Sequence, residues 1–449
     1  MTQAVDDARP AAPVINPVSD GYRAYAMWML LIVYILNFVD RQVINILAEP
    51  IKNELGLLDW QVGAMSGLAF ALFYTVLGLP IARYAERGHR PRIIAVALAL
   101  WSGFTALCGL AQNFTQLVLA RIGVGIGEAG CTPPAHSLIT DYVPKEKRAS
   151  GLAFYSMGTP LGSLVGMGLG GVVADAWGWR AAFIVCGLPG LLMAVVVALT
   201  LIEPRAKRVA ADVRAAGAKG VTFTQALAVL AKKRTFWLVA LAAAVKAFIG
   251  YGHAPFTASF FFRNHTEEIA RLASLFGLQS AGFLGLALGI VGGVAGAFGA
   301  YVGGQIADKY GGRDLRAYVS VPAIAALATI PIYITAVLLP SALGAMCLLA
   351  INAILGTLWY GPVYATAQSI APAHMRATAS AILLFIINLV GLGLGPLLVG
   401  ALSDVLAIQG GMGKAEGVRW ALIISALSGV ASAVFFWMAR KTIRTEMEG

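Results

Sequence analysis

Charged residues inside apolar stretches are the side chains of this chain best placed to do chemistry. Five ionisable residues lie in stretches that are otherwise apolar and long enough to cross a membrane: Asp40, Arg41, Arg121, Glu128 and Lys246. A charge at the centre of a bilayer costs about 2.5–3.5 kcal/mol on insertion scales, so such residues mark pathways more often than packing. Burial disfavours the charged form of a carboxyl group and a neighbouring arginine favours it, while guanidinium groups match phosphate or carboxylate. These residue types therefore predict a site for protons and an anionic ligand.

Depth along the helices brings four of these residues together. At about 1.5 Å per residue, Asp40 and Arg41 lie roughly 10 Å from the outer end of the first apolar stretch, and Arg121 roughly 9 Å from that of the fourth. Glu128 lies two turns further on the same face, about 10 Å deeper. The spacing predicts one charged cluster. A structural network of ion pairs without a ligand is the alternative interpretation.

The second half of the chain offers a lysine and an aromatic group. Lys246 lies near the middle of the seventh stretch, where it can pair with a carboxylate across a cavity or serve packing alone. Trp359, Tyr360 and Tyr364 share the tenth stretch and are the best candidates for a ligand wall. An apolar, aromatic wall beside one charged cluster suits an amphipathic lipid, and it also suits an aromatic acid.

Composition identifies the elements that must position these side chains. Hydrophobic residues make up 59% of the 449 residues and charged residues 12%, against about 25% charged in soluble domains. Twelve apolar stretches have the length of a membrane-spanning helix, about 20 residues; they lie near 25–47, 61–82, 92–112, 116–139, 149–174, 181–202, 236–260, 281–306, 317–338, 343–368, 377–402 and 419–439. A β-barrel would show short alternating segments instead. The sequence predicts an all-α membrane protein with twelve transmembrane helices.

Two internal repeats indicate that these helices form two similar halves. The stretch Ala82–Arg90 resembles Gly304–Arg313 with an offset of 222 residues when the acidic residues are aligned, and Val143–Ser150 resembles Ala371–Thr378 with an offset of 228. In an apolar chain, such repeats are typical of transporters. The predicted parts are a disordered tail at 1–21, a six-helix half at 22–202, a basic cytoplasmic linker at 203–235, a second six-helix half at 236–440 and a tail at 441–449.

Glycines recur every four residues in two of the stretches. Gly158, Gly162, Gly166 and Gly170 do so in the fifth, and Gly285, Gly289 and Gly293 in the eighth. Small residues at this spacing let helices approach closely. Both a sliding surface between the halves and static packing fit this pattern.

The basic residues predict the orientation. With both termini inside, 24 of the 33 Lys and Arg residues fall in inner segments and six in outer segments, as the positive-inside rule requires. Topology explains the net charge of +11, so no nucleic-acid partner is expected. We expect a multi-pass protein of a bacterial-type inner (plasma) membrane, with both termini cytoplasmic and membrane lipids around it.

Other function classes find no support in the residues. The four cysteines show no metal-ligand spacing, and there is no catalytic soluble domain or phosphate-binding loop. We therefore expect no metal, no cofactor and no enzyme activity.

The motifs resemble those of the major facilitator superfamily, whose signature loop lies between helices two and three and again between eight and nine. Within it, the chain is similar to the spinster family, on the strength of Asn37–Arg41 (Asn-Phe-Val-Asp-Arg), Arg121–Ala129 with its Gly-Glu-Ala, and Gly158–Gly162. The organic anion–cation symporters share a similar first motif and the Gly-Glu-Ala. The chain departs from the pattern in Glu86, where the family has Asp, so the first latch should differ in geometry. It also departs in Phe38, where Tyr is usual, which removes a hydroxyl group near the site.

The resemblance implies a proton-coupled secondary transporter, acting as a monomer by alternating access on an anionic amphipathic substrate such as a lysophospholipid or sphingoid phosphate. A symporter for small carboxylates is the alternative. The implied proton-coupling residues are Asp40 and Glu128. The implied substrate-binding residues are Arg41, Arg121, Asn37, Lys246, Trp359, Tyr360 and Tyr364. The implied gating residues, which would latch the cytoplasmic face, are Glu86, Arg87, Arg90, Asp141, Arg148, Asp308, Lys309, Arg313 and Arg376.

Overall fold

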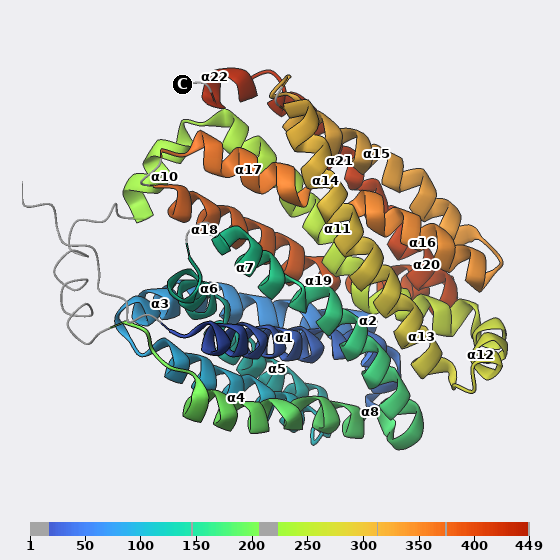
Figure 1. Ribbon diagram of the computed structural model, residues 1–449. Helices are drawn as coiled ribbons and strands as arrows, with labels where there is room; N and C mark the ends of the chain where they lie inside the picture. The colour runs from blue at the N-terminus through green and yellow to red at the C-terminus, as the bar shows by residue number, and fades with distance from the viewer. Residues whose placement is uncertain (1–17, 145–146, 206–222, 312, 373–374, 448–449) are drawn as a thin grey trace, which may run out of the picture.

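The protein is all-helical throughout the part of the chain that the structure describes. This computed structural model describes residues 18–144, 147–205, 223–311, 313–372 and 375–447 (Figure 1), and it contains helices and no strand in those ranges. Much of the predicted N-terminal tail and of the predicted linker lies outside them.

The first half is built from helices that alternate in direction. They are α1 (Asp20–Leu55), α2 (Asp59–Gly63) continuing through the π-helical turn Ala64–Leu68 into α3 (Ala69–Arg87), α4 (Arg90–Cys108), α5 (Phe114–Glu128) with α6 (Thr132–Tyr142), α7 (Arg148–Ser156) and α8 (Gly158–Thr200).

The second half repeats this order after the linker. A short α10 (Phe223–Ala231) precedes it, and its helices are α11 (Arg234–Asn264), α12 (Thr266–Leu275), α13 (Ser280–Gly289) continuing into α14 (Gly296–Gly311), α15 (Ala317–Leu338), α16 (Ala342–Thr357) with α17 (Tyr360–Ile370), α18 (Arg376–Ile386) continuing into α19 (Gly395–Asp404), α20 (Gly413–Leu427) with α21 (Gly429–Ala439), and α22 (Ile443–Met447).

Ten continuous helical segments of the described chain are long and apolar enough to span a membrane, and two local features account for the difference from twelve. The 51-residue segment Ser150–Thr200 contains two spans, because Gly178 has a φ of 83° and turns the chain back. The fourth span is divided after Glu128, where Pro133 and Pro134 open α6 and lack the amide hydrogens that would continue α5. The prediction of twelve transmembrane helices is confirmed.

The two halves lie side by side and diverge toward one end. In Figure 1 the first half (blue to green) lies below the second (yellow to red), and their helices meet on the right and spread apart on the left. We call the end that carries residues 203–205 and 440 the inner end, following the orientation predicted from the sequence, and the opposite end the outer end. One continuous cluster of buried apolar side chains joins both halves toward the outer end, and it includes Val43 and Phe256. Toward the inner end each half has a largely separate core, although Leu392 of the second half packs into that of the first.

The predicted glycine rows lie in different interfaces. In α8, the row from Gly158 to Gly170 packs against α1 of the same half. The row from Gly285 to Gly293 instead faces α8 across the junction of the halves, where a β-carbon at Gly285 would lie 2.1 Å from the backbone oxygen of Met167. The eighth span therefore carries the glycine surface that lies between the halves, and the fifth-span row serves packing within one half.

Candidate functional site

An arginine–glutamate pair forms the centre of the site. Arg41 on α1 donates to Glu128 Oε2 on α5 from Nη2 at 2.5 Å and from Nε at 3.1 Å. The Glu128 side chain is fully buried, whereas Arg41 keeps 12% of its side chain exposed. Arg41 is thus the member of the pair that a ligand can reach.

Glycines on α5 explain how Glu128 comes so close. A β-carbon at Gly125 would lie 2.6 Å from the backbone oxygen of Phe70 on α3, and one at Gly127 would lie 2.5 Å from the backbone nitrogen of Trp101 on α4. Neither position tolerates a side chain, so the helix can press between its neighbours and bring Glu128 within reach of α1.

Aromatic rings surround the Arg41 guanidinium. Its central carbon lies 4.9 Å from the centroids of Phe38 and Phe70 and 5.0 Å from that of Tyr74, within the range of cation–π attraction. Phe70 and Tyr74 also stack on each other at 5.3 Å. The rings fix the position of the cation while leaving one side of it open.

Asp40 and Arg121 lie next to this pair but are fully enclosed. Arg121 donates from Nη1 to the backbone oxygen of Asp40 at 3.3 Å. The exposed fraction is 0% for Arg121 and 1% for Asp40. Several buried polar atoms here have no hydrogen-bond partner among the described residues. They are both carboxylate oxygens of Asp40, Nε and Nη2 of Arg121, and the amide nitrogen of Asn37. The structure thus brings the four charged residues together on α1 and α5, but of these only Arg41 is partly exposed.

Lys246 lies away from this cluster, inside the second half. Its Nζ donates to Thr329 Oγ1 on α15 at 3.4 Å, and it forms no ion pair with any carboxylate of the described chain. Further along α11, His253 Nε2 forms a hydrogen bond with Ser425 Oγ at 2.8 Å, and its ring stacks on that of Tyr333 with a centroid distance of 4.5 Å. Of the two roles left open for Lys246, pairing with a carboxylate is not seen among the described residues, and its side chain points toward α15.

Aromatic side chains of the second half face the first. Tyr364 lies within electrostatic range of Tyr34 and Tyr74, and Tyr251 within range of Arg41. Tyr360 is half-buried and stacks on the buried Trp359 at 4.1 Å, so Tyr360 and Tyr364 are the accessible members of the predicted wall. Sequence reasoning left Tyr251 out of the site, although its place one turn beyond Lys246 was a usable signal.

At the inner end, the gating residues that the structure describes form contacts within one half. Arg90 donates to Asp141 Oδ2 at 2.6 Å and also bonds Glu203, and Arg205 bonds Asp141 at 2.8 Å. Burial alone would raise the pKa of Glu203, but the hydrogen bonds and charge of Arg90 outweigh it and lower that pKa. This cluster ties α4, α6 and the end of α8 together.

The remaining gating residues make fewer contacts. Arg148 donates to the Val143 backbone oxygen at 3.4 Å, and Asp308 accepts from Tyr318 at 3.5 Å. Three further basic gating residues are exposed and form no ion pair with a described carboxylate; they are Lys309, Arg313 and Arg376. The side chains of Glu86 and Arg87 lie outside the described part of the structure. Among the described residues, the gating residues therefore form no ion pair between the halves at the inner end.

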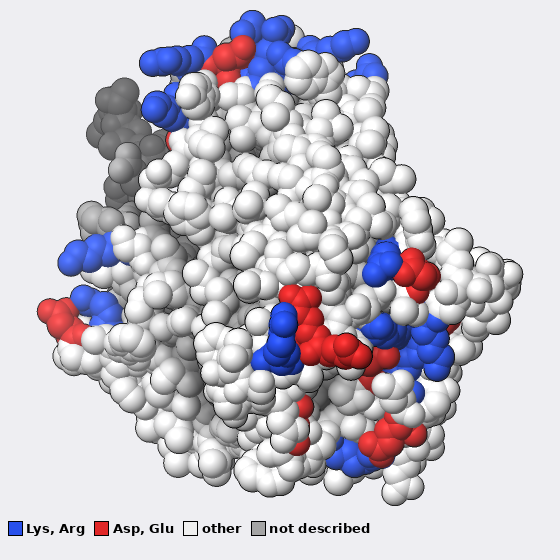
Figure 2. Space-filling view, turned by 90° about the vertical axis from the view of Figure 1, so that its right-hand side faces the viewer, with Lys and Arg blue, Asp and Glu red and all other residues white. Residues whose placement is uncertain are grey.

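At the outer end, an ionic cluster that the sequence analysis missed joins the halves. Arg263 on α11 donates to both oxygens of Glu49 at 2.9 and 2.6 Å and to both oxygens of Asp59 at 2.9 and 2.8 Å. Asp59 also bonds Lys52, and it accepts from Ser403 Oγ at 2.7 Å. Figure 2, which faces the outer end, shows acidic and basic side chains close together on this surface. Charges at the outer ends of the first and seventh spans were the available signal.

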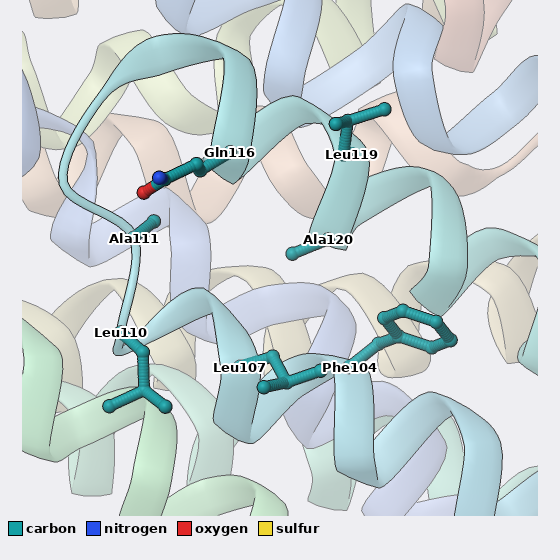
Figure 3. Close-up of a pocket in the computed structure, with 7 residues that line it drawn as sticks. All are labelled: Phe104, Leu107, Leu110, Ala111, Gln116, Leu119 and Ala120. Carbon is teal, nitrogen blue, oxygen red and sulfur yellow. The ribbon is translucent and has the colours of Figure 1, made fainter.

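A surface groove near the outer end is separate from the charged cluster. It has a volume of about 390 Å³ and lies where α4 ends and α5 begins (Figure 3), lined by Phe104, Leu107, Leu110, Ala111, Gln116, Leu119 and Ala120. Its one polar side chain, Gln116, already accepts a hydrogen bond from the backbone of Gln112. The groove offers apolar surface and no charge.

The arrangement as a whole defines a class of protein. Two similar six-helix halves meet around a charged and aromatic site, and every hydrogen bond between the halves in the described chain lies at one end. This is the architecture of a secondary transporter of the membrane and not of an enzyme.

Comparison with known proteins gives the family. The model of the Major Facilitator Superfamily matches residues 30–396, and the chain belongs to this superfamily. It is similar to an MFS-type efflux pump of Mycolicibacterium smegmatis, with 32% identity over 442 residues, which is 98% of each chain. A probable L-galactonate transporter of Escherichia coli is 31% identical over 170 residues, 38% of this chain and 37% of that one.

A solved structure extends the likeness to the spinster family. The crystal structure of a bacterial homologue of the human lysosomal transporter Spinster, in an inward-facing and unoccupied conformation, superimposes with a TM-score of 0.82 and 32% identity, covering 96% of this chain and 99% of that one. The predicted resemblance to the spinster family is confirmed.

Proposed function

We propose that this transporter is a proton-coupled secondary transporter for an anionic amphipathic substrate of the lysophospholipid or sphingoid phosphate kind. The observation that carries the proposal is the pair of Arg41 and Glu128, in which the partly exposed arginine is held by a fully buried carboxylate. An anionic headgroup that binds Nε and Nη2 of Arg41 takes the place of Glu128 there. A proton on Glu128 removes the competing charge, so proton binding and anion binding favour each other.

Asp40 is the second proposed proton site. It lies on the same helix as Arg41, it is buried, and neither of its carboxylate oxygens accepts a hydrogen bond from the described residues. Burial favours the protonated form of a carboxyl group, although the Ser102 and Thr105 hydroxyls lie close enough to the Asp40 carboxylate to oppose this effect. Arg121, which donates to its backbone, supplies the positive charge that limits this effect. We assign Arg121 and Asn37 to supporting this site and Arg41 to contacting the substrate headgroup.

The lipid-like tail is assigned to the aromatic side. Phe38, Phe70 and Tyr74 lie around Arg41, and Tyr360 and Tyr364 come from the facing half. Apolar and aromatic surface beside one cationic group fits a single-chain lipid with an anionic head. The likeness to a Spinster homologue supports the same assignment.

We further propose an inward-open resting state and alternating access by a single chain. In the described residues every hydrogen bond between the halves lies at the outer end, and the gating residues at the inner end would pair when that end closes. The basic inner segments favour both termini in the cytoplasm.

Transport of small carboxylates is the alternative function, and the likeness of a 170-residue segment to a probable L-galactonate transporter favours it. Flux of a labelled lysophospholipid into proteoliposomes under an imposed pH gradient separates the two. Gradient-driven flux that is lost in Glu128→Gln supports the lipid proposal. Absence of lipid flux from the natural protein, together with gradient-driven flux of galactonate in the same vesicles, would establish the alternative.

A further inference from the structure

Two aspartates at the outer end each cap a helix of the opposite half. Asp404, at the end of α19, accepts from the backbone nitrogens of Asp59 at 3.0 Å and Trp60 at 2.8 Å, at the start of α2. Asp175, in α8, accepts from the backbone nitrogens of Ala281 at 3.2 Å and Gly282 at 2.6 Å, at the start of α13. Each carboxylate thus bridges the two halves.

The N-cap side chains of the capped helices do not bond the first amides, although in α2 the Gln61 side chain accepts from the Leu58 backbone nitrogen at 2.9 Å. The residues preceding them, Leu58 and Gln279, provide no capping hydrogen bond from a side chain. The first amides of a helix lack partners within the helix, and a carboxylate there is favoured by the helix dipole as well. The caps that these helices need therefore come from the other half of the molecule.

The two contacts are related by the internal repeat. Ala281 lies 222 positions after Asp59, and Asp404 lies 229 positions after Asp175, which equal one of the sequence offsets, 222, and come within one residue of the other, 228. The close approaches beside the caps follow the same rule. A β-carbon at Gly400 would lie 2.3 Å from the Asp59 backbone oxygen, and one at Gly171 would lie 2.1 Å from that of Ala281. The two cap contacts therefore occupy equivalent positions of the internal repeat.

We infer that Asp175 and Asp404 are paired latches that hold the outer end closed, and that both must release before the outer end opens. The inference rests on the proposed alternating access. When the halves separate at the outer end, four backbone amides lose their partners at once. The α2 latch is reinforced by the ionic cluster around Arg263, whereas the α13 latch has no such neighbour among the described ion pairs. Asp175 is therefore the cleaner of the two to test.

The test measures the distance between spin labels on the outer ends of the two halves. Labels are attached to Gln112→Cys and Arg271→Cys, both exposed, with the exposed Cys347 replaced by Ser. Loss of one cap costs about 1 kcal/mol, so Asp175→Ala and Asp404→Ala should each raise the ratio of open to closed outer ends about fivefold. Since the two contacts share no residue and join different pairs of helices, the double variant should show about a 25-fold rise.

Glu268→Ala is the matched control. Glu268 also caps a helix at the outer end, accepting from the Ala342 nitrogen at 2.6 Å, but α12 and α16 belong to the same half. Its loss should leave the distance distribution unchanged. An equal shift in this control would overturn the inference, since it would show general loosening. If the alanine variants do not fold, Asp175→Glu and Asp404→Glu misplace the carboxylate and should shift the distribution in the same direction.

A second pair of labels, at Arg92→Cys and Lys441→Cys on the inner end, separates failure of the latches from failure of alternating access. The latches alone would be overturned if the outer and inner distances change with pH or with added lysophospholipid in the natural protein, but the double alanine substitution does not alter the distances. Distances that never vary in any variant or condition would overturn alternating access itself.

Discussion

Replacing Glu128 by Gln should make anion binding tighter and less dependent on pH. Arg41 makes two hydrogen bonds to one oxygen of a fully buried Glu128, and hydrogen bonds to charged groups contribute about 1.5–3 kcal/mol net. Glutamine keeps an acceptor but no charge, and charge-assisted bonds are roughly twice as strong as neutral ones. An anion competing for Arg41 therefore saves about 0.8–1.5 kcal/mol for each hydrogen bond that it displaces, which is at least about tenfold in affinity when both are displaced.

Equilibrium binding of a labelled lysophospholipid, followed from pH 5.5 to 8, measures this effect. In the natural protein, affinity should fall as the pH rises, because Glu128 becomes charged and competes with the ligand. In Glu128→Gln, affinity at the upper end of the range should be about tenfold higher and should vary less with pH, the remaining variation coming from Asp40. The same variant should lose flux driven by a pH gradient in proteoliposomes while remaining folded.

Asp314→Asn provides the control, because it removes the charge from another arginine–carboxylate pair, at 3.1 Å from Arg444 and outside the site. It should bind and transport as the natural protein does. An unchanged affinity and an unchanged pH dependence in Glu128→Gln would refute the reasoning, since Arg41 would then not be shared between Glu128 and the ligand.

Three further changes test the site, the inner cluster and the interface. Arg41→Ala should weaken binding of the anionic ligand at least tenfold, and Arg41→Lys should fall between, because an ammonium group cannot form the guanidinium fork; an unaltered affinity would move recognition elsewhere. Glu203→Gln should lower the free energy of unfolding at pH 7 by about 2 kcal/mol. Arg90 lowers the pKa of Glu203 in the folded protein. The stabilisation by Glu203 is therefore fully present above the unfolded pKa of about 4.3 and is lost as the pH falls through the lower pKa of the folded state. Thermal unfolding curves of the two proteins should therefore converge in acid, and a constant gap down to pH 3 would contradict this. Gly285→Ala should destabilise the joined outer end by about 1–3 kcal/mol, whereas Gly292→Ala, with no atom within 4 Å of its β-carbon, should not; equal thermal stability of the two variants would show that the interface yields freely.

The fold could be predicted because it depends on composition along the chain. Twelve apolar stretches of spanning length and two repeat offsets suffice, since hydrophobicity over about 20 residues decides insertion. The divided fourth span was less visible: Pro133 and Pro134 mark it, but a kink does not change the hydropathy of the stretch.

The site could be predicted only in part, because spacing gives depth but not direction. Depth placed Asp40 and Arg121 level, and Arg121 does bond the backbone of Asp40. The same arithmetic placed Glu128 about 10 Å deeper, yet Arg41 reaches it, because a long side chain can cross two helical turns. Which arginine holds Glu128, and that Lys246 turns toward α15, depend on how each helix is rotated about its axis. That rotation is set by packing, for example at Gly125 and Gly127.

The internal repeat is visible in the contacts between the halves at the outer end, but not in the charged site. At the outer end, the contact of Asp404 with α2 has its counterpart in Asp175 with α13. The charged site has no such counterpart, because α1 carries Asp40 and Arg41 whereas α11 carries Lys246 and His253, which bond only neutral partners in the described chain. A rocking motion requires matched contacts on both sides of the junction, so the repeat is retained there. Coupling requires one carboxylate and one arginine in competition, and a single half is enough to supply them.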